Sequence, residues 1–206
     1  QIRSRPIAEN GTVVRPDILD RNVRLLARDL PFFDLYARPA DFWNKSEDTR
    51  RLAQVTGVSE ARLARAFAGK HPNVLVAKQI TPVTRDKVMH LGLPGIEFQA
   101  STKRFYPESD ARQVIGITQA VSGGHGIAGI EKGLNAQLAA GKPALLSLDM
   151  RIQYALRHSL ELTQAKYDAK AAGGIVLNVN TGEILAMASL QDPKRAGYDP
   201  ARNIMA

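Results

Sequence analysis

The sequence contains no cysteine, few aromatic residues and no long apolar run, and each absence narrows what the chain can be. Without cysteine, a disulfide scaffold and a cysteine-ligated metal site are both excluded. The apolar runs are short, such as Ile184–Ala188, and none approaches the ~20 residues that cross a bilayer as a helix. The chain begins with Gln1 instead of methionine, as we expect of a protein cut after a membrane anchor.

The composition allows a folded core, and the positive net charge has more than one interpretation. With 206 residues, 44% of them hydrophobic, the chain can form one large domain or two small ones. The net charge of +8 has three interpretations: a solvated basic surface, a nucleic-acid-binding surface, or proximity to anionic lipid head groups. Several arginines cluster near the start of the chain: Arg3, Arg5, Arg15, Arg21, Arg24 and Arg28. Nucleic-acid binding favours interleaved aromatic residues, and these make up only 6% of the chain, so we expect a solvated surface.

The first two thirds of the chain alternate short strands with short helices. We expect strands within residues 1–30, at 31–37 and 74–77, and either two strands or one hairpin at 95–98 and 103–107. The expected helices lie at 47–55, 60–68, 111–117 and 130–138, with another beginning at Pro82. Gly57 is placed to end the first helix, and Ser59 and Thr81 are placed as N-caps. This pattern predicts an α+β fold.

The last third reads as a helix followed by a hairpin. Asp149 is expected to cap a helix over about 150–169, with Ile152, Leu156, Leu160 and Thr163 as its buried stripe and Gly173-Gly174 at its end. Strands at 175–178 and 184–188 should pair across a turn at 180–183. Gly141–Pro143 marks a boundary, so we expect one domain over residues 1–143 and a second over 144–206.

Nothing in the sequence assembles a catalytic or metal site. No serine has a lysine three residues later, and no Lys-Thr-Gly or Lys-Ser-Gly occurs. The four histidines lack metal-ligand spacing, and the glycine-rich segment 122–126 lacks the Lys-Ser/Thr of a phosphate loop. Phe42 and Trp43 favour a packing anchor, although an exposed pair would indicate a partner site. We therefore expect no catalytic residue, no cofactor and no metal.

Five blocks follow one another in an order that resembles class B penicillin-binding proteins, most closely the cell-division type. The blocks are Arg15–Ala27, Tyr36–Pro39, Leu91–Pro107, Gly126–Lys132 and Leu146–Ser189. The resemblance assigns structural roles to ten motif residues: Arg15, Asp20, Arg21, Asn22, Arg104, Tyr106, Gly129, Glu131, Gly182 and Glu183. Glu131 has no second carboxylate or base near it in sequence, which favours a structural role over acid–base catalysis.

Two positions and one connection depart from the family's pattern. Pro16 and Val23 stand where the family has glycine, and a β-branched residue resists positive φ, so we expect the turn at Asn22-Val23 to be reshaped. The connection from Leu138 to Ser147 is also much shorter than the family's. Either the loop is shortened here, or residues are left out of the sequence; the residues leave both interpretations open.

The resemblance implies an elongated, non-catalytic pedestal, the dimerisation domain, followed by the truncated start of a transpeptidase domain. In that family the complete protein is a serine-type D,D-transpeptidase that cross-links peptidoglycan stem peptides and is acylated by penicillins. It is anchored by one N-terminal transmembrane helix at the periplasmic face of the cytoplasmic membrane. Implied partners are the membrane-embedded glycan polymerase and other division proteins, with a homodimer left open and no nucleic acid. Because Ser-x-x-Lys is absent, this chain itself is expected to have no activity.

Two other classes of function stay open from the sequence. The chain could be a free-standing basic module of the cell envelope or, with less support, a nucleic-acid-binding protein. If 144–206 is a truncated domain, one helix cannot bury all the apolar residues of its hairpin, and a two-stranded hairpin is marginal alone. We then expect this segment to be the least stable part of the chain or to be covered by a second copy.

Overall fold

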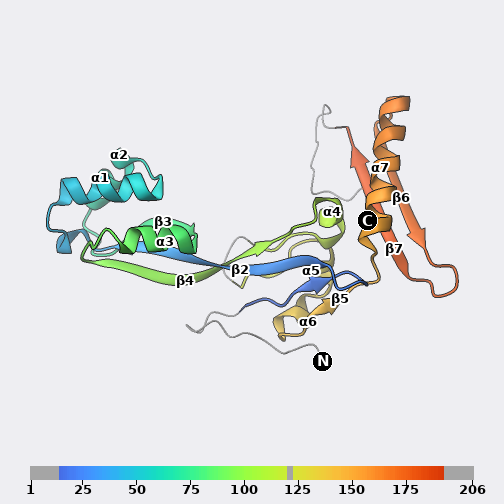
Figure 1. Ribbon diagram of the computed structural model, residues 1–206, viewed down its shortest axis with the longest axis horizontal. Coiled ribbons are helices and arrows are strands. Elements are labelled where there is room, and N and C mark those ends of the chain that lie inside the picture. Colours follow the sequence, from blue (N-terminus) through green and yellow to red (C-terminus); the bar gives the residue numbers. More distant parts are fainter. Residues whose placement is uncertain (1–13, 120–122, 193–206) are drawn as a thin grey trace. The chain divides into compact units, whose positions relative to one another are not determined.

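The computed structural model describes residues 14–119 and 123–192, which form two compact units. Unit 1 comprises residues 14–29 together with the described residues from 104 onward, and unit 2 comprises residues 30–103. The strands expected before residue 14, with Arg3 and Arg5, lie outside the described residues, as does Ser122, the first residue of the glycine-rich segment 122–126. Helices and strands mix in both units (Figure 1), so the α+β class predicted from the sequence is confirmed.

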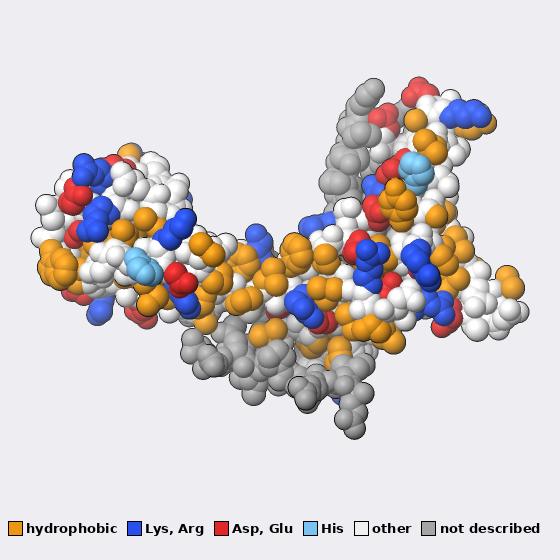
Figure 2. Space-filling view, viewed as in Figure 1, with side chains coloured by type: hydrophobic (Ala, Val, Ile, Leu, Met, Phe, Trp, Pro, Cys, Tyr) orange, Lys and Arg blue, Asp and Glu red, His pale blue; other side chains and the backbone are white. Residues whose placement is uncertain are grey.

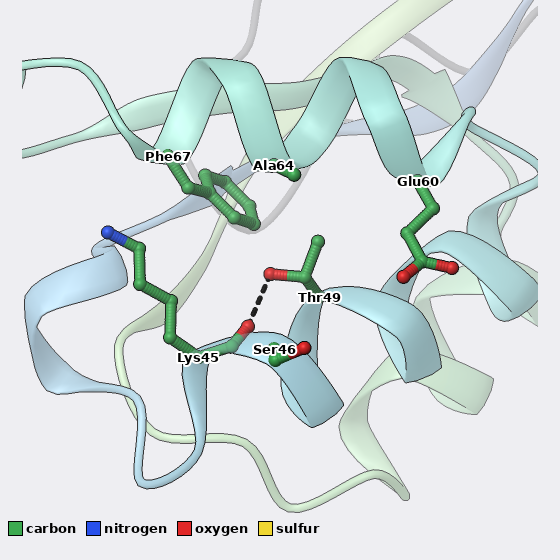
Figure 3. A pocket seen from close by; sticks show the side chains of 6 residues that line it. All are labelled: Lys45, Ser46, Thr49, Glu60, Ala64 and Phe67. Carbon is green, nitrogen blue, oxygen red and sulfur yellow. Dashed lines mark hydrogen bonds between the residues drawn. The ribbon is translucent and has the colours of Figure 1, made fainter.

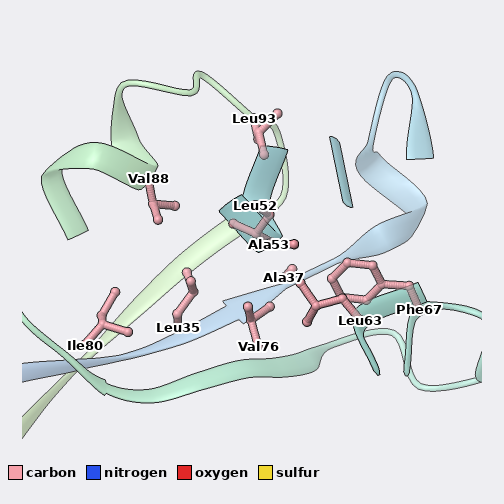
Figure 4. Packing of buried hydrophobic residues seen from close by; sticks show 10 residues of the cluster. All are labelled: Leu35, Ala37, Leu52, Ala53, Leu63, Phe67, Val76, Ile80, Val88 and Leu93. Atoms are coloured by element: carbon pink, nitrogen blue, oxygen red, sulfur yellow. The ribbon is translucent and has the colours of Figure 1, made fainter. Parts of the chain in front are cut away.

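Unit 2 packs three helices against a strand ladder. Strand β2 (Leu25–Ala37) reaches this unit with its second half, where it pairs antiparallel with β3 (Val74–Ile80), and β4 (Ile96–Phe105) also pairs with β2. The helices are α1 (Lys45–Thr56), α2 (Glu60–Phe67) and α3 (Pro82–Met89), after a short 3-10 helix η1 (Pro39–Asp41). Their buried apolar side chains meet those of the strands in one core (Figure 4), formed by Leu35, Ala37, Leu52, Ala53, Leu63, Phe67, Val76, Ile80, Val88 and Leu93.

The helix ends in unit 2 follow the predicted capping residues. Gly57 ends α1 with φ of 72°, a left-handed conformation that glycine adopts at little cost. Thr81 caps α3 by accepting a hydrogen bond from Thr84 N at 3.2 Å. Ser59 occupies the N-cap of α2 without a side-chain capping bond. The two predicted segments at 95–98 and 103–107 are instead one continuous strand, β4, because no glycine or proline interrupts residues 96–105.

Unit 1 contains a small sheet with short helices around it. Strand β1 (Ile18–Leu19) pairs antiparallel with the first half of β2 and parallel with β5 (Ala144–Leu145). The helices are η2 (Ser109–Ala111), α4 (Arg112–Ile115), α5 (Gly129–Gly133) and α6 (Asn135–Ala139). The single helix expected at 130–138 is thus two. Their core comprises Ile18, Leu26, Ala27, Ala111, Ile115, Leu138, Ala144, Leu148 and Met150.

The last described elements of unit 1 are a long helix lying on a hairpin. Helix α7 (Met150–Tyr167) packs on β6 (Ala171–Leu177) and β7 (Ile184–Gln191), which pair antiparallel as predicted (Figure 1). Asp149 caps α7 by accepting from Arg151 N at 3.0 Å, as expected. The helix ends earlier than predicted, at Asp168 with φ of 49°, and Gly173-Gly174 lies within β6.

The buried stripe of α7 is also shorter than predicted. Ile152, Leu156 and Leu160 are half-buried against the hairpin, but Thr163 is exposed because Gln164 occupies the inward position in that turn. None of the helices in the described ranges is both long and apolar enough to span a bilayer.

Candidate functional site: a buried ion-pair cluster and a hydrogen-bonded turn

Glu131, on α5, lies at the centre of a buried cluster in unit 1. Its side chain is fully buried, and each carboxylate oxygen accepts a hydrogen bond at 2.7 Å, one from Arg15 Nε and the other from Arg104 Nε. Both arginine side chains are 5% exposed. The Tyr106 hydroxyl lies 3.5 Å from the oxygen that bonds Arg104. Four of the ten motif residues are therefore brought together here, although 116 positions separate Arg15 from Glu131.

Two residues that the sequence analysis did not single out complete the cluster. Asp29 accepts from Arg15 N at 2.8 Å and from Arg104 Nη1 at 3.3 Å. Asn135 accepts from Arg15 Nη1 at 3.1 Å and from Gly126 N at 3.0 Å. Asp29 lies on the same face of β2 as buried Ala27, two positions away. An acidic residue on a face that points into the core needs a partner, and this pattern could have identified Asp29 from the sequence. The two positive guanidinium groups of the cluster, from Arg15 and Arg104, are balanced by two negative carboxylates, from Glu131 and Asp29.

The geometry favours a structural role for the cluster over a catalytic one. Buried charges are tolerated only where each is paired and hydrogen-bonded, as these are. Both oxygens of Glu131 are occupied by guanidinium groups and face no solvent, so neither is free to exchange a proton with a substrate. Burial raises the pKa of Tyr106, whose hydroxyl also accepts from Thr118 N at 3.2 Å. Within the described part of the chain, only Arg104 Nη2 lacks a hydrogen-bond partner among buried side-chain atoms.

Two glycines allow neighbouring backbone segments to pack closely against α5. Gly129 has φ of 58°, and a Cβ there would lie 2.5 Å from Val114 O. A Cβ on Gly126 would lie 2.0 Å from the carbonyl oxygen of Glu131 itself. Distances below 3.0 Å to backbone atoms do not occur for real side chains. These two glycines therefore fix the position from which Glu131 reaches the arginines.

Asp20 organises a second site, a tight turn after β1. Its Oδ1 accepts from Asn22 N and from Arg24 N, both at 2.8 Å, which holds the turn closed. Its Oδ2 accepts from Met150 N, the first residue of α7, at 3.3 Å. Arg21 N donates to Leu148 O at 3.0 Å. A single 1%-exposed carboxylate thus ties the N-terminal turn to the start of the long helix.

Val23 corrects the expectation that the turn is reshaped. It adopts φ of 65°, the left-handed conformation that glycine prefers, and its side chain is 68% exposed. The hydrogen bonds to Asp20, including Val23 N to Asp20 O at 3.0 Å, hold the backbone in this conformation. The unfavourable positive φ of a β-branched residue is therefore confined to Val23.

The remaining motif residues form the hairpin turn, with a weak link to the Asp20 turn. Gly182 has φ of 74° and donates its N–H to Asn178 O at 2.8 Å. Glu183 lies 3.7 Å from Arg21, and because both side chains are over a third exposed, the pair contributes little. The motif residues therefore divide among three places in unit 1: the Glu131 cluster, the Asp20 turn and the hairpin turn between β6 and β7.

The two edges of the β6–β7 hairpin differ. The side chain of Gln153, fully buried on α7, accepts from Met187 N at 2.9 Å and donates to Met187 O at 2.8 Å, as a neighbouring strand would. Gln113 accepts from Ser189 N at 3.4 Å further along β7. The outer edge of β6 pairs with no strand in the described ranges. The edge open to a further strand is thus β6.

No cluster in the described ranges has the composition of a metal site. Among those residues, no group of three or more His, Asp or Glu could hold a metal ion. Figure 2 shows Lys and Arg side chains interspersed with Asp and Glu, without a single-sign stripe on the described surface in view. That distribution favours a solvated basic surface over a nucleic-acid-binding one.

Comparison with known proteins places this chain in a family. Residues 11–144 match the penicillin-binding protein dimerisation domain, and the chain belongs to that family. It is 39% identical over 185 residues to the probable peptidoglycan D,D-transpeptidase FtsI of Caulobacter vibrioides, covering 86% of this chain and 31% of that protein. It is 28% identical to the peptidoglycan D,D-transpeptidase FtsI of Escherichia coli, covering 84% of this chain and 35% of that protein.

A solved structure shares the fold. Penicillin-binding protein 2X of Streptococcus thermophilus aligns with a TM-score of 0.69 at 20% identity, covering 92% of this chain and 37% of the other. This chain spans only about a third of the length of these relatives. The resemblance to penicillin-binding proteins drawn from the five sequence blocks is confirmed.

Proposed function

We propose that this chain is the pedestal of a class B penicillin-binding protein over residues 1–143, followed by the first elements of its transpeptidase domain over 144–206. The complete protein is then a serine-type D,D-transpeptidase that cross-links peptidoglycan stem peptides during cell division. The activity named for relatives of roughly threefold greater length supports this proposal. The chain itself supplies no acylated serine, because no Ser-x-x-Lys is present.

The task of the pedestal is to hold the catalytic domain at a fixed place relative to its membrane partners. We infer that an N-terminal transmembrane helix anchors the protein at the periplasmic face. The membrane-embedded glycan polymerase and other division proteins are the expected partners, and the name of the matched family supports a homodimer as a further arrangement. The open β6 edge supports a strand from the rest of the catalytic domain lying beside it.

One observation carries the positioning role: Asp20 bonds its own turn and the first backbone N–H of α7 with the same carboxylate. A rigid joint at the start of the catalytic segment is what a pedestal requires, because a misplacement of 1 Å can lower a rate by about 10²-fold. Asp20 is therefore a positioning residue that does not contact the substrate.

Asp20→Ala in the full-length gene product tests this role. Cross-linking of growing glycan should fall by roughly 10- to 100-fold, while acylation by a soluble fluorescent penicillin stays near the wild-type rate. Asp17→Ala is the matched control, because Asp17 forms only a solvent-exposed pair with Arg28. Equal loss of both activities would show that Asp20 supports the catalytic domain's own folding, and no loss of either would contradict positioning.

A further inference from the structure

A groove opens between the first two helices of unit 2. It has a volume of about 300 Å³ and is lined by Lys45, Ser46 and Thr49 of α1 and by Glu60, Ala64 and Phe67 of α2. Figure 3 shows Lys45 near Phe67 at one end, Glu60 at the other, and Thr49 facing Ala64 between them. The groove lies entirely within unit 2, whereas both sites described above belong to unit 1.

The floor of the groove is apolar and already fixed in place. Phe67 is 2% exposed and packs edge to face on Phe42, with ring centroids 5.5 Å apart. Thr49 Oγ1 donates to Lys45 O at 2.5 Å, which satisfies the hydroxyl and leaves the methyl group to line the space. The small side chain of Ala64 keeps the centre open. Such a floor offers burial to one apolar side chain without reorganising the helices.

The charges around the groove favour an acidic occupant. Residues 45–70 contain six basic and three acidic side chains. The ion pair of Glu47 with Arg50 cancels one charge of each sign, and Asp48 is buried, accepting from Asn44 N at 3.1 Å, so six basic less three acidic side chains leave this segment with a net charge of +3. Lys45 forms no ion pair within the described ranges, and its ammonium group stands at the Phe67 end of the groove. A carboxylate placed there would meet a net positive field.

A large, exposed aromatic side chain lies close in sequence to the groove. Trp43 is 82% exposed and precedes Lys45 by two residues. An isolated exposed apolar residue is ordinary, but an exposed tryptophan two positions before a groove-lining lysine has the composition of an interface hot spot. The exposure of Trp43 distinguishes it from Phe42, which is half-buried against the core.

We propose that the α1–α2 groove binds an acidic peptide segment of a partner protein. One apolar side chain of the peptide lies on Phe67 and Ala64, a neighbouring Asp or Glu pairs with Lys45, and Trp43 covers the rim. Glu60 at the far end discriminates against a second acidic residue there. This site goes beyond the pedestal role, because it needs unit 2 alone and would serve a free-standing module equally.

A random peptide library displayed on phage, selected on the full 206-residue chain, is the probe. Enriched peptides should pair an Asp or Glu with a nearby apolar residue. Lys45→Glu should weaken their binding by about tenfold or more, which is about 1.4 kcal/mol, and Ala64→Phe should abolish it by filling the groove. The matched controls are Lys78→Glu and Ala61→Phe, exposed positions of the same unit outside the groove, and they should leave binding unchanged.

Two further measurements keep the result decisive. Amide chemical shifts of Thr49 and Ala64 should move on peptide addition, which locates the site even if Ala64→Phe were to disturb folding. Vesicles of phosphatidylcholine with about 30% phosphatidylglycerol test the membrane as the occupant. Selection of basic peptides, unchanged affinity in Lys45→Glu, or vesicle binding that Lys45→Glu removes while no peptide is enriched would each overturn the proposal.

Discussion

Glu131→Gln isolates the contribution of the buried cluster in unit 1. The substitution keeps the shape of the side chain and removes the charge that both Arg15 and Arg104 face at 2.7 Å. The two guanidinium groups are 5% exposed and cannot reach water, and Asp29 balances only one of them. Breaking a buried pair in this way costs about 3–5 kcal/mol. We therefore expect unit 1 to lose that much of its free energy of unfolding.

The assay has to report on unit 1 alone. Trp43 belongs to unit 2 and is 82% exposed, so its fluorescence is a poor reporter. Amide hydrogen exchange around α5 and β1 should accelerate by roughly 10²- to 10⁴-fold, while exchange in α1 and α2 stays unchanged. Glu183→Gln is the matched control, and it should cost less than about 1 kcal/mol because its pair with Arg21 is exposed.

A second substitution tests whether charge balance is the cause. In the double variant Arg15→Leu with Glu131→Leu, Arg104 keeps Asp29 as its counter-charge at 3.3 Å. We expect this double variant to be more stable than Glu131→Gln alone, because no uncompensated charge remains buried. A loss below about 1 kcal/mol in Glu131→Gln, or a double variant less stable than the single one, would refute the account of the cluster.

Four other predictions follow from the geometry. Val23→Gly should raise the melting temperature of the chain, because relieving positive φ at a β-branched residue is worth about 1 kcal/mol; an unchanged or lower melting temperature would contradict this. Gly126→Ala should destabilise unit 1 by about 1–3 kcal/mol in urea titrations, since its Cβ would lie 2.0 Å from Glu131 O; tolerance of the alanine would show that α5 sits differently. The hydrogen bond from Arg151 lowers the pKa of Asp149, so the stabilisation by this group is complete above its ordinary pKa of 3.8 and is lost as the pH falls through the lower folded-state pKa. Arg151→Ala should therefore move acid unfolding to higher pH, as followed by circular dichroism, and an unmoved midpoint would contradict the assignment. Residues after Pro143 should exchange and be cleaved earlier than the rest at dilute concentration, because the β6 edge is open; equal protection in a proven monomer would make the chain a complete domain of its own.

The sequence predicted the helix ends and the hairpin turn, because these depend on interactions between residues close together in the chain. Gly57 and Thr81 end and begin helices where expected, because a left-handed residue and a capping hydroxyl act within one turn. The hairpin around Gly182 followed from a turn between two apolar strands. The end of α7 was missed, because Asp168 takes the left-handed conformation that the sequence suggested for a glycine.

Long-range partners were the part that the sequence could not supply. The motif assigned Arg15 and Glu131 to structural roles, but their direct contact joins residues 116 positions apart and depends on the whole of unit 1. Gln153 looked like one polar position on a helix, yet its amide bonds both backbone groups of Met187. Val23 was expected to reject positive φ, and the hydrogen bonds of Asp20 hold it there. Each of these outcomes depends on contacts that no local pattern encodes.

The most direct test of the pedestal assignment is labelling with fluorescent penicillin followed by a denaturing gel. The 206-residue chain and the complete product of the same gene are incubated side by side. The assignment predicts a labelled band for the complete product and none for the chain, because no serine here has a lysine one helical turn away to activate it. A labelled band at the mass of the chain, or no label on the complete product, would contradict it.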